Sequence, residues 1–132
     1  MKRLRSKLLL ACMSMLLLCG SNVALGISND DCSNAEPIGD VVDKSFETRG
    51  ATFDGAGRCM RGPNIWYCYT ASCTVTATVS LLGSGYDTSL AVYDGCGCDA
   101  SIGEGIACND DFENSLQSQI SFPVIAGRKY LI

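Results

Sequence analysis

The sequence contains no histidine. Hydrolytic serine and cysteine nucleophiles usually need a histidine base, so Ser-His-Asp and Cys-His pairs are excluded. A zinc site would need four cysteines, and no C-x-x-C pair is present to begin one or to form a redox centre. The fourteen acids leave room for a glycosidase-type carboxylate pair, but the sequence singles out no two of them. An enzyme is therefore the least favoured class of function.

Bases are scarce outside the N-terminus. Four of the ten lie within residues 1–7, and an apolar run over residues 8–19 and then small residues follow them. This order predicts a secretory signal peptide over residues 1–26, cleaved after Gly26 or, as second choice, after Ala24. Two alternatives stay open. They are an uncleaved anchor, because residues 8–27 are nearly long enough to span a bilayer, and a lipoprotein with lipid on Cys12.

The remaining chain of about 106 residues is acidic. All fourteen acids but only six bases lie in it, which gives a net charge of −8. Such a chain repels phosphates, so nucleic acid is excluded as a partner. Its length suits one small domain, residues 27–132. We expect it to be secreted, periplasmic or on the cell surface, with no membrane insertion after cleavage.

Amphipathic helical patterns are also lacking, and period-two alternation takes their place. Thr74–Leu81 places valine, alanine and leucine on one face and threonine and serine on the other, which predicts a strand with one buried face. Further strands are predicted over residues 64–71, 86–95 (with Leu90 and Val92 inward), 118–125 and 128–132. Glycine-rich turns separate them, so an all-β antiparallel sandwich or barrel is expected.

The last of these segments ends at Ile132 without a closing turn. A sandwich that ended there would leave an unpaired strand edge. We therefore expect either a domain that lacks its last strand or a second chain that supplies it.

Seven cysteines follow the predicted signal peptide, and export favours disulfides over metal ligands. Cys68 and Cys73 flank a four-residue connection between predicted strands, where opposed residues come close enough for a bridge. For the others we expect bridges Cys98–Cys108 and Cys32–Cys59. Cys96 is left as the free thiol. The connectivity stays open, since six cysteines allow fifteen pairings.

Acidic turns are candidates for calcium, which takes six to eight oxygen ligands from flexible loops. The candidate ligands are Asp87, Asp94, Asn109, Asp110 and Asp111. The alternative is that these residues only shape turns and keep a secreted surface soluble. Similarly, Trp66 and the tyrosines at 67, 69, 86 and 93 could form a platform for sugars, but such residues more often pack in a core. We expect Trp66 in the core.

Five stretches occur in an order that resembles a known family. They are "NDDCSNAEPIGD", "IWYCYTASCT", "YDTSLAVYDGCGC", "ACNDD" and "SQISFPVIAGRKYLI". Together they are similar to the bacterial pre-peptidase C-terminal (PPC-like) extracellular domains, in a cysteine-rich variant, over nearly all of residues 29–132. The resemblance implies a jelly-roll-like β-sandwich that acts as a non-catalytic accessory on secreted enzymes and surface proteins. It implies that the domain binds substrate or matrix, and that some members also bind calcium.

Two departures from the family pattern matter. Cysteine-rich members carry a further cysteine where this chain has Leu82, which would leave Cys96 without its partner. Members also continue past "YLI" into a closing strand. We therefore expect a truncated, disulfide-stapled, non-catalytic binding module for an extracellular polymer or protein. The alternatives are an adhesive surface protein that pairs through an open sheet edge and a calcium-stabilised carbohydrate binder.

Overall fold

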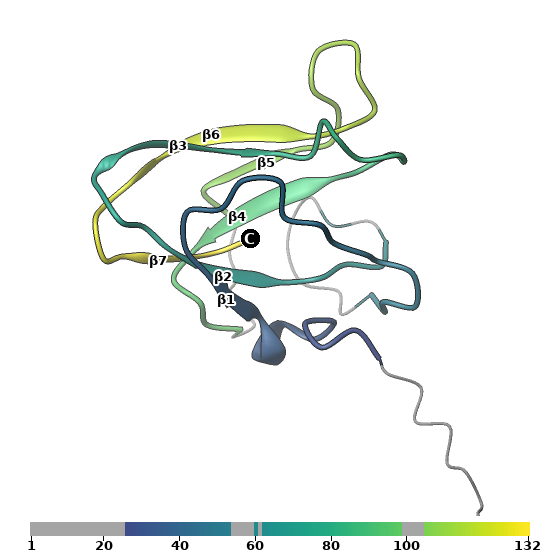
Figure 1. The fold of residues 1–132 in the computed structure, drawn as a ribbon, viewed down its shortest axis with the longest axis horizontal. Coiled ribbons are helices and arrows are strands. Elements are labelled where there is room, and N and C mark those ends of the chain that lie inside the picture. Colours follow the sequence, from purple (N-terminus) through teal and green to yellow (C-terminus); the bar gives the residue numbers. More distant parts are fainter. Residues whose placement is uncertain (1–25, 54–59, 61, 99–104) are drawn as a thin grey trace, which may run out of the picture.

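A computed structural model describes residues 26–53, 60, 62–98 and 105–132. The predicted signal peptide, apart from its last residue, lies outside the described residues, as does Cys59. Seven strands and one short 3-10 helix form (Figure 1). Their bounds are η1 Cys32–Asn34, β1 Glu36–Ile38, β2 Tyr67–Thr70, β3 Val75–Ser80, β4 Leu90–Asp94, β5 Ala107–Asn109, β6 Gln119–Val124 and β7 Lys129–Leu131.

The strands form two sheets, and the predicted all-β sandwich is confirmed. One sheet has five strands in the order β1-β2-β7-β4-β5, and the other pairs β3 with β6. Strands β1 and β2 are parallel, whereas every other pair is antiparallel. In Figure 1 the β3–β6 pair lies above the larger sheet. All five predicted strand segments contain an observed strand, while β1 and β5 were not predicted.

The main core fills the space between the two sheets. Alternation on β6 sends Ile120, Phe122 and Val124 inward, while the residues between them are exposed or half-buried. From the larger sheet, Leu90 and Val92 of β4 face them, as predicted, together with Tyr130 of β7. The Phe122 and Tyr130 rings meet edge to face, with centroids 5.5 Å apart, a favoured aromatic geometry.

The opposite face of the five-stranded sheet is also buried. There Ala91 and Tyr93 of β4 pack with Leu131, Cys32 and Trp66. The N-terminal segment covers this face and is held to Trp66, because the Asn29 side-chain amide donates to the Trp66 carbonyl at 2.9 Å. Trp66 is 1% exposed, which confirms its predicted place in the core. Strand β4 is therefore buried on both faces, and not on one alone.

The C-terminal strand lies inside the sheet. Strand β7 pairs with β2 on one side and with β4 on the other, and its ladder with β2 extends to Ile132, which exchanges both backbone hydrogen bonds with Tyr67 at 2.8 Å. The expectation that this segment leaves an unpaired edge is therefore wrong. A hydrophobic strand such as this one is better protected from water between two neighbours than at a margin.

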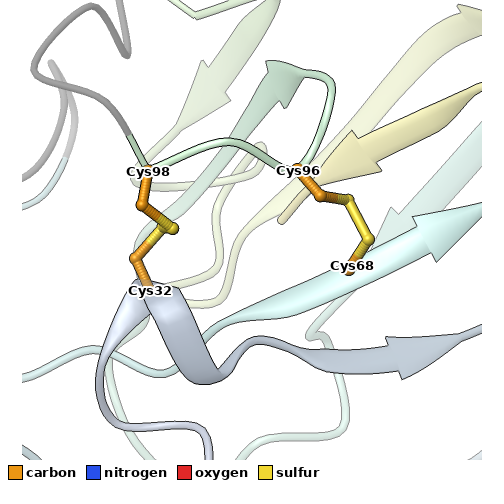
Figure 2. The surroundings of a disulfide bond; sticks show 4 residues. All are labelled: Cys32, Cys68, Cys96 and Cys98. Atoms are coloured by element: carbon orange, nitrogen blue, oxygen red, sulfur yellow. A yellow bond between two sulfur atoms is a disulfide. The ribbon is translucent and has the colours of Figure 1, made fainter.

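Two disulfides meet at the Cys96-Gly97-Cys98 turn that follows β4 (Figure 2). Cys96 is bonded to Cys68 of β2, and Cys98 is bonded to Cys32 of η1. Gly95 turns the chain out of β4 with a φ of 74°, in the left-handed region that favours glycine. The turn thus fixes the strand β2 and the N-terminal segment to the end of β4.

The predicted connectivity is wrong at every pair that the structure describes. Cys68 does not pair with Cys73, whose thiol is free and exposed. Cys96 is not the free thiol, and Cys98 does not pair with Cys108, which is in another disulfide. Cys32, bonded to Cys98, is not available for Cys59. The physical reason is that β2 and β4 both pair with β7, so the turn after β4 needs only to cross β7 to bring Cys96 to Cys68, although the two cysteines lie 28 residues apart in sequence.

Candidate ligand-binding groove

The two sheets are unequal, and this leaves part of the sandwich open. Strand β6 contacts β4 and β5, whereas β3 contacts none of the other described strands except β6. The apolar face of β3 therefore extends beyond the sheet that should cover it. Val75 is 51% exposed, and Ala77, Val79 and Leu81 are only partly buried. The face of this strand that was predicted to be buried is thus only partly covered.

Beside β3 lies a groove of about 1140 Å³. One wall is the inner face of β3, the floor includes Tyr69 of β2 and Ile38 of β1, and Ile132 also contributes. The second wall is the segment of residues 39–48 that follows β1, with Val41 and Phe46 facing the space. Tyr86 and Leu90 close one end.

The start of the second wall is held by hydrogen bonds to the Asp40 carboxylate. The Tyr69 hydroxyl donates to one oxygen at 2.7 Å, and the Ser72 hydroxyl donates to the other. Both bonds favour the ionised acid, so they lower the pKa of Asp40. Burial, the hydrogen bond to Asp40 and its negative charge together raise the pKa of Tyr69 to about 12. At neutral pH, therefore, the carboxylate is charged and the phenol keeps its proton.

The middle and end of the wall are held as well. The Lys44 ammonium contacts Glu36 at 2.7 Å and lies 5.4 Å from the centre of the Tyr67 ring. Phe46 meets the Tyr86 ring edge to face, with centroids 6.4 Å apart, and the Thr48 hydroxyl donates to the Tyr86 hydroxyl at 3.2 Å. Three separate contacts to the sandwich thus keep this irregular segment in place.

Apolar side chains dominate the groove, and its charged groups are mainly acidic. Among the described residues that line it, Asp40, Asp43 and Asp87 are acidic and Lys44 is the one base. Because Lys44 is already paired with Glu36, the unpaired charge of these described residues is negative. The Cys73 thiol also borders the space. An apolar channel with a few polar groups is the usual form of a ligand site, and here it is open enough to admit an extended molecule.

No family model matches the chain. Neither a curated protein nor a solved structure matches it. The disulfides indicate an oxidising compartment. In the part of the chain that the structure describes, no helix has the length and apolar character needed to cross a membrane.

The four acidic candidate calcium ligands, Asp87, Asp94, Asp110 and Asp111, do not form a metal-holding cluster. Among the described residues, no three cysteine or acidic side chains form a cluster that could hold a metal ion. The Asp94 carboxylate is engaged by the Arg128 guanidinium, whose Nε donates at 3.0 Å. Asn109 is used within the fold, since its amide donates to the Asp111 carbonyl at 2.8 Å and accepts from the Gln119 backbone at 3.0 Å. Calcium binding stays a prediction without a formed site.

Sequence reasoning missed the groove. Its second wall has no regular structure, so no periodic pattern marks residues 39–48. The adjacent valines Val41 and Val42, 53% and 88% exposed, were the available signal of the groove, because neighbouring apolar residues in a short polar loop indicate a binding surface. Of the tyrosines considered as a platform for sugars, Tyr67, Tyr69 and Tyr86 line the groove, whereas Tyr93 is buried on the other face of the sheet.

Proposed function

We propose that this chain is a secreted, non-catalytic binding module of the PPC-like class, which holds part of an extracellular polymer or protein in the groove beside β3. The observation that carries the proposal is the groove itself. It is large and apolar, and its irregular wall is fixed through Asp40, Lys44 and Phe46. A wall that is already in place loses little conformational freedom when a ligand binds, which favours affinity.

The acidic rim and the net charge of the chain bear on the ligand. Anionic polymers would be repelled, while a neutral glycan or a protein segment with basic residues would not. This charge preference is compatible with the accessory function expected from the sequence. Acidic polysaccharides should therefore be the weakest ligands in any binding panel.

Two adjacent valines allow a matched test. Val41 lines the groove and Val42 does not, yet both are exposed, so a charge at either position should leave the fold intact. The chain would be screened against neutral and acidic glycans and matrix proteins. We expect at least one neutral member to bind the wild type and Val42→Glu equally, and Val41→Glu at least tenfold more weakly, because a charge is placed against its apolar contact.

Equal binding by the two variants, or no binding across the panel, would contradict the proposal. Turnover of a bound glycan or protein would contradict its non-catalytic part. Circular dichroism of both variants checks that they fold.

A further inference from the structure

The exposed strand edges of the molecule differ in how well they are protected. Edge strands usually carry charges or proline, or are very short, because an open edge pairs with other chains. Strand β1 has three residues that include Glu36 and Pro37, and β5 has three residues. Strand β6 carries Pro123. Strand β3 has six residues, Val-Thr-Ala-Thr-Val-Ser, with no charge, proline or glycine.

Register shows which backbone groups of β3 face outward. The Gln119 N–H donates to the Asn109 side chain, so it points away from β3, and in an antiparallel ladder every second residue points the same way. Pro123 therefore has its ring on the outer edge of β6. On β3 the partners of Gln119, Ser121 and Pro123 are Ser80, Thr78 and Thr76. The N–H and C=O groups of these three residues face the open edge.

These outward groups are available. Thr76, Thr78 and Ser80 are exposed, and among the described residues no backbone hydrogen bond joins them to any segment outside the β3–β6 ladder. Leu81, by contrast, donates to Ser118 at 2.9 Å, on the side of β6, as the alternation requires.

The sequence of this edge is a palindrome. Reading out from Ala77 in either direction gives threonine, then valine, then threonine or serine, over residues 74–80. When two copies pair antiparallel about a two-fold axis at Ala77, Val75 lies opposite Val79 and Thr76 opposite Thr78. The threonine pairs are those whose backbone groups face outward, so the hydrogen-bond alternation and the palindrome select the same register.

We propose that two copies of this chain associate through β3, in that register, to form a continuous four-stranded sheet β6-β3-β3-β6. Each of the two Thr76–Thr78 pairs exchanges two backbone hydrogen bonds. The valines and alanines of both copies fall on one face and cover the exposed side of Val75. The edge carries no charge, so two acidic chains meet there without like charges opposed.

The contact is isologous and each copy has one such edge, so association stops at the dimer. The proposal does not require a ligand in the groove. Thr78 and Ser80 of this edge also line the groove, so the dimer and a groove ligand would share part of this surface.

Two substitutions at one rung of the ladder test the interface. Thr78 and Ser121 are opposed in the β3–β6 register, and the N–H of each points away from the other strand. Thr78→Pro thus blocks the open edge, while Ser121→Pro places the same ring on the far edge of the same sheet. In analytical ultracentrifugation of the oxidised chain we expect a dimer for the wild type and Ser121→Pro, and at least tenfold weaker association for Thr78→Pro.

Charge variants provide a second measurement if proline prevents folding. Thr78→Lys should dissociate the dimer, Ser121→Lys should not, and adding Thr76→Glu to Thr78→Lys should restore it, because positions 76 and 78 are opposed only in this register. A monomeric wild type at millimolar concentration, or equal effects of the Thr78 and Ser121 variants, would overturn the proposal.

A cysteine trap tests the axis directly. At a non-hydrogen-bonded pair the Cα atoms are about 4.5 Å apart, within reach of a disulfide. In a Cys73→Ser background, Ala77→Cys should yield a covalent dimer on mild oxidation, and Val79→Cys, which lies on the same face but opposite Val75, should not. Crosslinking by both variants, or by neither, would refute this register.

Discussion

Removing each disulfide as a pair of Cys→Ser changes gives the most informative test of the fold. In the chain-entropy account, a crosslink stabilises by closing a loop in the unfolded chain. Cys68–Cys96 closes a span of 28 residues and Cys32–Cys98 one of 66. These lengths correspond to about 3.6 and about 4.3 kcal/mol respectively.

The two crosslinks are nested, and this alters the second value. With Cys68–Cys96 formed, the path from Cys32 to Cys98 shortens to about 38 residues, and its closure is worth about 3.9 kcal/mol. Each double variant should thus lose roughly 3 to 4 kcal/mol, so that the Tm falls by roughly 15–25 °C. The nesting lowers both losses equally: removal of Cys68–Cys96 with Cys32–Cys98 retained should cost about 3.1 kcal/mol, so Cys32–Cys98 remains the more stabilising of the two crosslinks.

The assay is urea unfolding of the oxidised chain followed by Trp66 fluorescence, with Cys73→Ser as the control. Because the Cys73 thiol is free and exposed, its loss should change the unfolding free energy by less than about 0.5 kcal/mol. A destabilisation by Cys73→Ser as large as that of the double variants would refute the connectivity. Cleavage before aspartates should also leave peptides 31–39 and 54–86 both joined to peptide 94–98, and a Cys68–Cys73 bridge within peptide 54–86 would contradict this connectivity.

Two further predictions concern the core and the groove wall. Phe122→Ala should lower the unfolding free energy by about 3–5 kcal/mol, because Phe122 is 2% exposed between the sheets. As the control, Leu116→Ala, at a side chain 59% exposed, should change the unfolding free energy by less than about 0.5 kcal/mol. Equal urea midpoints for the two variants would be incompatible with the sandwich core. Since the pKa of Tyr69 is raised from 10.0 to about 12, its contribution to stability is complete below pH 10 and is lost as the pH rises toward 12. Urea midpoints should fall less steeply over that range in Tyr69→Phe than in the wild type, and parallel curves would exclude the contact with Asp40.

The strands could be predicted where apolar residues alternate. This holds for β3 and β6, in which valine, alanine, isoleucine and phenylalanine occupy every second position. It fails for β1 and β5, since three residues do not establish a period. The alternation also does not reveal whether a face is covered. Val75 has the pattern of a core residue and is exposed, because β3 lies beyond the larger sheet.

The disulfides could not be predicted because sequence spacing reports only local proximity. The hairpin logic that favoured Cys68–Cys73 holds for neighbouring strands, but β2 and β3 belong to different sheets. What brings Cys96 to Cys68 is the pairing of both β2 and β4 with β7, a segment more than 30 residues further along the chain, which the turn after β4 crosses. The groove is likewise formed by segments that are far apart in sequence. Its walls come from β1, β2, β3 and the segments that follow β1 and β3.

The position of β7 has a consequence for how the chain matures during synthesis. Because β7 follows the other described strands in the chain and lies between β2 and β4, the large sheet cannot close until β7 has been synthesised. Cys68 and Cys73 emerge well before Cys96. When a disulfide oxidant of the compartment forms a mixed disulfide with one of them, the nearest thiolate displaces the oxidant, which leaves as its reduced dithiol. The pair that spacing suggests would then form first as a non-native bridge, and its exchange for Cys68–Cys96 would become the slow step that a disulfide isomerase accelerates.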